Sequence, residues 1–183
     1  MFIQTEDTPN PATLKFIPGR IVMAAGTADF RTVDTAGRSP LARALFGVGG
    51  VDGVFLGSDF VSVTKAADAE WFAVKPAVLA AIMDHYTSGL PAVEEAEAVV
   101  ATGEPDSEIV VQIKEILETR VRPAVAQDGG DIVFHDFDDG VVYLQMHGSC
   151  SGCPSSTATL KAGIENMLRY YIPEVREVRA VAA

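Results

Sequence analysis

The most informative part of the chain is residues 129–154, GGDIVFHDFDDGVVYLQMHGSCSGCP. Two runs in it, Ile132–Phe137 and Val141–Met146, are rich in β-branched and aromatic residues, which favour strands. The tripeptide Asp138-Asp139-Gly140 between these runs is a strong signal for a hairpin turn. The glycine pair at the start is expected to end one helix, and Pro154 is expected to open another. The stretch therefore predicts a β-hairpin between two helices.

Segments on either side of the hairpin complete an α+β unit. Before it, apolar residues recur at helical spacing behind an N-cap at Asp106 or Ser107, namely Ile109, Ile113, Ile116, Leu117 and Val121. After it, a helix is expected from Pro154 to about Tyr170, and a last strand over Val175–Val181. The predicted order is helix, hairpin, helix, strand.

The first half of the chain predicts a second α+β arrangement. We expect two short strands, Thr13–Ile17 and Arg20–Met23, around a Pro18-Gly19 turn, followed by a short helix over Leu41–Phe46. A hairpin of Val51–Leu56 and Phe60–Thr64 and a long helix over Asp68–Tyr86 are expected next. Ser39-Pro40 supplies an N-cap and a first-turn proline for the short helix. Pro76 is expected to break or kink the long helix, because proline removes a helical hydrogen bond.

An acidic stretch that contains two glycines and two prolines, Ser88–Asp106, lies between the two halves. It has no apolar face to bury, which is typical of a linker. The expected fold class is therefore α+β, with two small domains, residues 1–87 and 107–183, joined by a flexible linker over residues 88–106.

Composition and charge exclude several classes of function. The 183 residues are 48% hydrophobic and 21% charged, as in ordinary soluble proteins. The net charge of −11 argues against nucleic acid and anionic lipid as partners, since both attract clustered Lys and Arg. The first residues lack the features of a signal or transit peptide, and the longest apolar run, near Ala77–Met83, is too short to cross a bilayer. We expect a cytoplasmic protein, either bacterial or an organelle protein already processed.

Both cysteines of the chain lie in Cys150-Ser151-Gly152-Cys153-Pro154, between a predicted strand and a predicted helix. The first turn of a helix offers free N–H groups and a positive dipole end, which stabilise negative charge. We therefore expect lowered pKa values for both thiols. A lowered pKa favours the thiolate, which is the form that binds metal or attacks disulfides. A secreted fold held by several disulfides is excluded by this cysteine count.

Several uses of the cysteine pair compete. Two buried structural thiols fit poorly at a glycine-flanked helix start, and a haem attachment site requires His where Pro154 stands. A thioredoxin-like dithiol also occupies a strand-to-helix junction, but the predicted strand is the second arm of a hairpin rather than part of a βαβ unit. A metal site is the third use, although zinc and cubane clusters require four ligands. Other side chains, or a second copy of the chain, would complete such a shell.

The histidines do not separate these alternatives. His147-x-x-Cys150-x-x-Cys153 has plausible spacing for zinc, but a histidine at a strand end is more often an ordinary surface residue. His85 and His135 have no cysteine or carboxylate pattern around them. Spacing alone leaves an iron–sulfur cluster, zinc and dithiol redox chemistry open.

Motifs in both halves resemble those of one family. In the second half, Arg122–Asp131 (RPAVAQDGGD) and Gly148–Ser156 (GSCSGCPSS) are similar to the NifU-type C-terminal domain. In the first half, Met1–Pro11 (MFIQTEDTPNP) and Leu14–Gly19 (LKFIPG) resemble the N-terminal domain of Nfu proteins, and Asp59–Lys65 continues that match. The two motif sets occur in the right order and leave only the expected linker unmatched.

The resemblance implies an Nfu-type iron–sulfur cluster carrier and not an enzyme. Such proteins receive a [4Fe–4S] cluster from an assembly scaffold, hold it between the two subunits of a homodimer and deliver it to apo-proteins; a [2Fe–2S] cluster is the alternative cargo. Carried over to this sequence, the metal- and cofactor-binding residues are Cys150 and Cys153, and no catalytic residue is implied. The Asp128–Asp131 motif is interpreted as a helix stop, with Asp131 supporting a neighbouring loop.

The resemblance also gives the first half of the chain a role, the recognition of partner proteins. A stabilising or solubilising domain is the other interpretation of that half. The runner-up function, from a different class, is a CxxC thiol–disulfide oxidoreductase.

Overall fold

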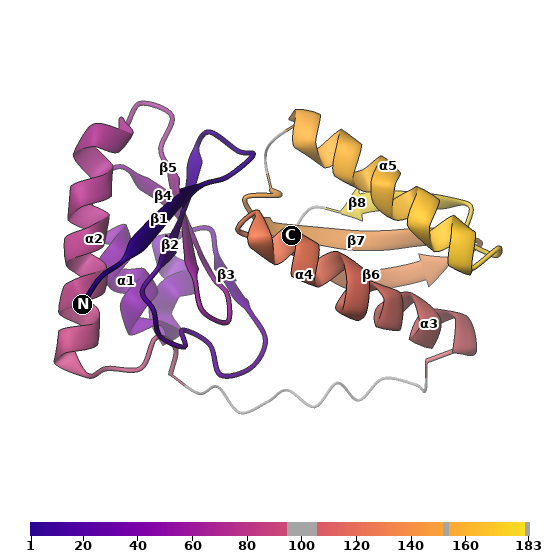
Figure 1. Cartoon of the computed structure of the whole chain (residues 1–183), viewed down its shortest axis with the longest axis horizontal. Helices are drawn as coiled ribbons and strands as arrows, with labels where there is room; N and C mark the ends of the chain where they lie inside the picture. The colour runs from indigo at the N-terminus through magenta and orange to yellow at the C-terminus, as the bar shows by residue number, and fades with distance from the viewer. Residues whose placement is uncertain (95–105, 152–153, 182–183) are drawn as a thin grey trace. The chain divides into compact units, whose positions relative to one another are not determined.

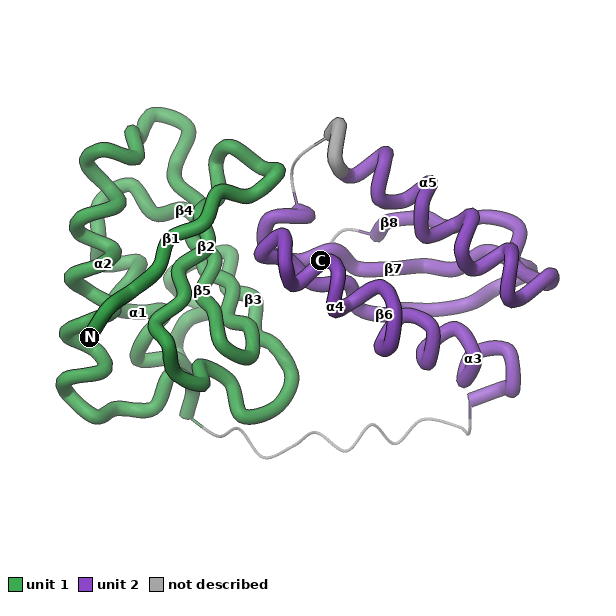
Figure 2. The backbone as a smooth tube through the Cα atoms, in the orientation of Figure 1, with its two compact units in different colours: residues 1–99 green, residues 100–183 purple. Residues whose placement is uncertain are grey.

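A computed structural model of the chain describes residues 1–94, 106–151 and 154–181 (Figure 1). The chain divides into two compact units, Met1–Val99 and Val100–Ala183, coloured separately in Figure 2. Each unit combines helices with a mainly antiparallel sheet, which confirms the α+β class. Among the described residues, no helix combines the length and the apolar character that a membrane crossing requires.

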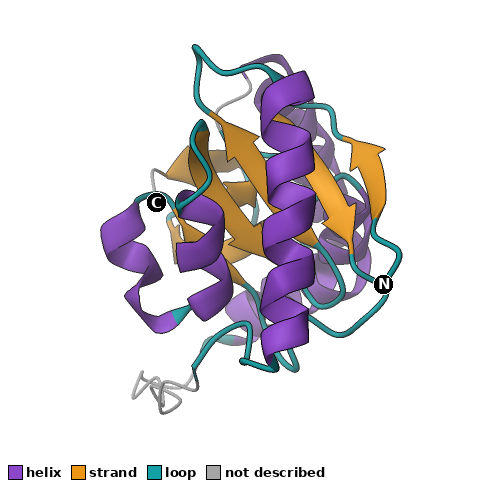
Figure 3. Cartoon of the chain, turned by 90° about the vertical axis from the view of Figure 1, so that its left-hand side faces the viewer, coloured by secondary structure: helices purple, strands orange, loops and turns teal. Residues whose placement is uncertain are grey.

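Unit 1 is built on a five-stranded antiparallel sheet in the order β1-β2-β5-β4-β3. Its strands are β1 (Gln4–Asp7), β2 (Thr13–Ile17), β3 (Ala28–Phe30), β4 (Val51–Leu56) and β5 (Val61–Lys65). Its helices are a 3₁₀ helix (Val33–Arg38), α1 (Pro40–Phe46) and α2 (Trp71–Ser88). Figure 3 shows α2 lying across one face of the sheet. The expected strand at Thr13, the short helix, the hairpin and the long helix are confirmed.

The expected strand over Arg20–Met23 is wrong. The N–H groups of Val22 and Met23 both donate to the carbonyl of Ser58, at 2.8 and 3.2 Å, so this segment joins no strand ladder. The neighbour of β2 is instead β1, with Gln4 opposite Ile17. β1 is a short edge strand of polar residues, which is why hydrophobic periodicity did not predict it.

Of the two effects expected at Pro76, a break or a kink, the break in the long helix is wrong. α2 continues from Trp71 to Ser88 with Pro76 inside it. The buried face of the helix, which includes Val74, Val78 and Ile82, packs into the core of unit 1. Burial of these side chains offsets the hydrogen bond that proline removes, since helices in proteins are stabilised mainly by packing.

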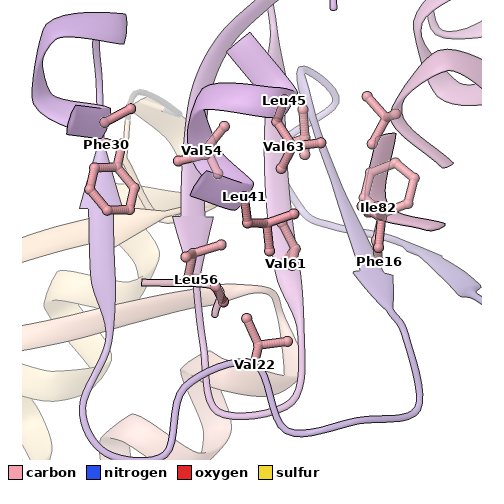
Figure 4. Packing of buried hydrophobic residues seen from close by; sticks show 14 of the residues in the cluster. Phe16, Val22, Phe30, Leu41, Leu45, Val54, Leu56, Val61, Val63 and Ile82 are labelled. Carbon is pink, nitrogen blue, oxygen red and sulfur yellow. The ribbon is translucent and has the colours of Figure 1, made fainter. Parts of the chain in front are cut away.

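The core of unit 1 lies between its sheet and its helices. Figure 4 shows Leu41 and Leu45 of α1 and Ile82 of α2 gathered with buried residues of the strands. Ser39 is fully buried and caps α1, because its Oγ accepts a hydrogen bond from the N–H of Ala42 at 3.0 Å. The predicted N-cap is therefore confirmed.

The first part of the expected linker, residues 89–94, packs on unit 1. Ser39 Oγ donates to the carbonyl of Ala92 at 2.5 Å, and the N–H of Glu94 donates to the carbonyl of Arg38 at 2.8 Å. Ala92 is buried in the same core. Unit 1 thus extends at least to Glu94, and residues 95–105 of the expected linker lie outside the described residues.

Unit 2 has the predicted order of helix, hairpin, helix and strand. Its elements are α3 (Glu108–Ile116), a π-helical turn (Leu117–Val121), α4 (Arg122–Gln127), β6 (Gly130–Asp138), β7 (Val141–Gly148), α5 (Pro154–Tyr171) and β8 (Glu177–Val181). The sheet order is β6-β7-β8, with β6 and β7 antiparallel. Ser107 is the N-cap of α3, accepting from the N–H of Val110 at 3.4 Å, as predicted.

The connection around the cysteine motif differs from the sequence-based expectation. β8 pairs with β7 in the parallel direction, so β7, α5 and β8 form a βαβ unit. β7 is both the second arm of the hairpin and the first strand of this unit. The cysteine motif therefore does follow a strand of a βαβ unit, as in a thioredoxin-like dithiol, and the opposite expectation is wrong. The parallel partner β8 lies at the far end of the chain, so the hairpin alone does not predict it.

The helix before the hairpin contains one irregular turn, and a proline accounts for it. The N–H of Arg122 donates to the carbonyl of Leu117, five residues earlier, instead of the usual four. Pro123 follows directly; in a regular helix its ring would clash with the carbonyl four residues before it. The wider π turn, after which α4 begins at Arg122, accommodates the proline.

Candidate functional site

Cys150 lies in the short loop between β7 and α5. Its side chain belongs to the hydrophobic core of unit 2 and is only 7% exposed. In the part of the chain that the structure describes it is a free cysteine. Cys153, the second predicted ligand, lies outside the described residues, so its assignment stays a prediction.

The sulfur of Cys150 rests directly on Gly130, the first residue of β6. A Cβ atom at position 130 would lie 2.5 Å from the Sγ of Cys150 and 2.9 Å from the carbonyl oxygen of His147. Both distances are shorter than any ordinary contact of a Cβ atom, so only glycine fits here. Gly130 therefore fixes where the thiol sits.

Two hydroxyl groups hold the backbone on either side of the thiol. Ser149, which is almost fully buried, donates through Oγ to the carbonyl of Asp128, and its N–H donates to the carbonyl of Gly129 at 3.2 Å. Thr157, in the first turn of α5, donates through Oγ1 to the carbonyl of Cys150 at 3.1 Å. Together these bonds tie the cysteine loop to the end of α4 and to the start of α5.

A partly buried ion pair between Arg122 and Asp131 joins the strand next to the loop to the preceding helix. Asp131 is 3% exposed, and Arg122 donates to both of its carboxylate oxygens, from Nε at 2.8 Å and from Nη2 at 2.9 Å. The N–H of Ile132 also donates to Oδ1 of Asp131, at 2.8 Å. Arg122 reaches Glu118 as well, at 2.5 Å. The ion pair that connects Asp131 to Arg122 of the preceding helix was not predicted from the sequence.

The expectation of a lowered thiol pKa is wrong for Cys150. Burial disfavours the thiolate and raises the pKa of Cys150 to about 11, and the charges of Asp128 and Asp131 act in the same direction. A hydrogen bond with Ser149 opposes this rise. The thiol is therefore protonated at neutral pH, and a metal would have to displace the proton on binding.

The three histidines lie on β7, β6 and α2, outside the loop that carries Cys150. His147 lies on β7 opposite Asp131, and the pleat directs its side chain to the sheet face opposite to that of the buried Met146. His135 is exposed on β6, and His85 is buried in unit 1. Within the described ranges, no group of three or more His, Cys, Asp and Glu side chains is placed to hold a metal ion.

Family comparisons assign both halves of the chain. Residues 3–89 match the family described as "Scaffold protein Nfu/NifU N terminal", and residues 113–179 match the "NifU-like domain". The first match coincides with most of unit 1, and the second spans the cysteine motif in unit 2.

Curated relatives align with almost the whole chain. The human "NFU1 iron-sulfur cluster scaffold homolog, mitochondrial" is 54% identical over 183 residues, which cover 99% of this chain and 72% of the human protein. The "NifU-like protein 4, mitochondrial" of Arabidopsis thaliana is also 54% identical, over 97% of this chain and 65% of that protein. This chain thus spans about two thirds of the length of such relatives.

A solved structure also resembles part of the chain. The crystal structure of a Staphylococcus aureus protein is 30% identical and covers 45% of this chain and 99% of its own, with a TM-score of 0.41. Because this TM-score is low, the family assignment rests on the sequence matches.

Proposed function

Because this chain belongs to the Nfu/NifU-like family of iron–sulfur cluster scaffold proteins, we propose that it is a carrier that binds a cluster through Cys150 and Cys153 and passes it to apo-proteins. The cluster is cargo, so the chemistry is exchange of ligands without turnover of a substrate.

One observation carries the proposal: Cys150 is held in a fixed position on Gly130 at a strand-to-helix junction, with a second cysteine three residues later. Thiolate is the ligand type that iron–sulfur clusters prefer. A protonated, buried thiol protects the apo form from oxidation, because reactivity belongs to the thiolate. Iron binding replaces the proton and creates the thiolate only when the cargo arrives.

A second copy of the chain would complete the ligand shell. A cubane cluster takes four thiolates, and this sequence offers two cysteines. Two copies related by a two-fold axis supply Cys150 and Cys153 twice around one cluster. We propose a [4Fe–4S] cluster at this junction, with [2Fe–2S] as the alternative. A cluster between subunits is open to an incoming thiol, which suits delivery.

A thiol–disulfide oxidoreductase is the second candidate, and one observation favours it. The cysteine motif occupies the strand-to-helix junction of a βαβ unit, as a thioredoxin-like dithiol would. A redox-active dithiol needs one thiolate at neutral pH, and the raised pKa of Cys150 leaves that role to Cys153. Because the family matches are to cluster scaffold proteins, the carrier is the better supported of the two functions.

We propose that unit 1 recognises the partners that give or take the cluster. It contains no cysteine, so it is not a second thiolate site. An assembly scaffold as the donor and apo iron–sulfur proteins as acceptors are the expected partners. The relatives named above are mitochondrial, which fits the expected alternative of a processed organelle protein.

Anaerobic reconstitution with iron and sulfide tests the ligand assignment. We expect the unaltered chain to gain the brown colour of a cluster, and Cys150→Ser and Cys153→Ser to gain none, because serine removes the soft thiolate. His147→Ala is the matched control and should retain the full iron and sulfide content. A full cluster in either serine variant would contradict the proposal, and its loss in His147→Ala would identify a third ligand.

A further inference from the structure

The backbone of Gly130 and Asp131, which lies against the Cys150 thiol, is held in place by an ion pair. Gly130 pairs with Gly148 across the hairpin, and Asp131, the next residue, pairs with His147. Since the Sγ of Cys150 lies where a Cβ of Gly130 would come within 2.5 Å, any shift of this segment moves the sulfur or opens a gap beneath it.

Asp131 is the residue through which this segment is fastened to the preceding helix. Its carboxylate is buried and receives a two-pronged hydrogen bond from Arg122, the geometry in which Arg–carboxylate pairs are most directional. The donor sits just after the π-helical turn, beside Pro123. A continuous connection therefore runs from the helix to the thiol, through the π-helical turn, the ion pair of Arg122 with Asp131, and Gly130.

We propose that Arg122 and Asp131 are positioning residues for the first ligand, because their ion pair fixes Gly130 and thereby holds the Cys150 sulfur where the cluster binds. Neither residue is itself a ligand. The effect on cluster binding rests on the function proposed above, whereas the effect on the position of the thiol rests on the contacts alone. One experiment therefore measures the thiol in the apo protein, and a second measures the bound cluster.

The first experiment measures alkylation of Cys150 in the apo protein, in the full chain carrying Cys153→Ser so that only one thiol reacts. Arg122→Gln leaves the Asp131 carboxylate buried without its cationic partner, so we expect Cys150 to react about tenfold faster than in the parent. Arg122→Lys keeps the charge without the two-pronged geometry and should give an intermediate rate.

Two control variants separate positioning from a general loss of stability. Arg169→Gln makes the same chemical change at an exposed arginine, which pairs with the partly buried Glu165 on α5, and should leave the alkylation rate unchanged. Ile172→Val opens a small gap in the same core near the far end of α5 from Cys150, and should lower the stability of unit 2 with little effect on the thiol. If Arg122→Gln alkylates at the parent rate, or no faster than Ile172→Val at equal stability, the positioning role is overturned.

The second experiment uses chains with both cysteines and follows release of the cluster to a chelator under anaerobic conditions, at a temperature where every variant is folded. Arg122→Gln and Asp131→Asn should both release the cluster several-fold faster than the parent, and the double variant should add little, since both remove one interaction. Release at the parent rate in both single variants would overturn the link to the cluster. Faster alkylation in a chain that never takes up a cluster would instead contradict the proposed function and leave the positioning role standing.

Discussion

Replacing Gly130 with alanine tests the close approach on which the site depends. The new Cβ would lie 2.5 Å from the Sγ of Cys150, almost 1 Å short of the 3.4 Å at which ordinary contact begins. It would also lie 2.9 Å from the carbonyl oxygen of His147, which is backbone and moves only with the hairpin. Overpacking of this kind typically costs about 1–3 kcal/mol, so we expect a loss of about 2 kcal/mol. For a unit of this size that lowers Tm by roughly 10 °C.

Thermal unfolding of the apo chain by circular dichroism measures this effect, and the chain offers two internal controls. Trp71 is the only tryptophan and lies in unit 1, so tryptophan fluorescence reports whether unit 1 is unaffected. Gly163→Ala adds the same methyl group to unit 2 in the middle of α5, with nothing within 4 Å, and should stabilise the unit by up to about 1 kcal/mol.

A double-mutant cycle identifies the cause of the loss. In a Cys150→Ala background the shortest contact of the new methyl group is gone, so Gly130→Ala should cost about half as much. The contacts with the His147 carbonyl oxygen and, at 3.1 Å, with the backbone nitrogen of residue 150 account for the remainder. The reasoning is refuted if Gly130→Ala raises Tm as Gly163→Ala does, or if its cost is the same with and without the sulfur.

Three further predictions concern other parts of the chain. Burial of His85 lowers its pKa, so below about pH 6.5 the unfolded chain binds more protons than the folded chain, and the stability of unit 1 should fall as the pH drops. In urea titrations His85→Leu should flatten this pH dependence, whereas His135→Gln, at an exposed position, should not. Burial raises the pKa of Cys150 to about 11, so in the apo Cys153→Ser chain its alkylation rate should still be rising at pH 10, whereas a rate that levels off near pH 8 would show an ordinary thiol. Ser39→Ala removes the cap of α1 and the hydrogen bond to Ala92, and should destabilise unit 1 by about 1–2 kcal/mol in chemical denaturation, while Ser58→Ala, at an exposed turn, should change stability by less than about 0.5 kcal/mol.

Local signals in the sequence predicted most elements of both units. The Asp138-Asp139-Gly140 turn, the Ser39 and Ser107 caps and the helical spacing of Ile113 and Leu117 each depend on a few neighbouring residues, and all are found in the structure. β1 and the parallel pairing of β8 were not predicted, because both depend on which distant strand lies alongside.

The candidate site was predicted in position but not in environment. The strand-to-helix placement of Cys150 follows from local patterns, and it is confirmed. Its burial depends on Gly130, twenty residues earlier, and the ion pair between Arg122 and Asp131 joins a helix to a strand across nine residues. Neither contact has a periodic signal, so the raised pKa of the thiol could not be anticipated.

The central claim, that one cluster is shared by two copies of this chain, is tested most directly by measuring cluster content and molecular mass on the same reconstituted sample. Iron and sulfide analysis combined with light scattering under anaerobic conditions should give about four iron and four sulfide atoms per two chains of 19.4 kDa, in a particle of twice the chain mass. Removal of the cluster with a chelator should then shift the population towards monomer, because a ligand that binds only the dimer stabilises it. A monomer that retains a full [4Fe–4S] cluster would contradict the account.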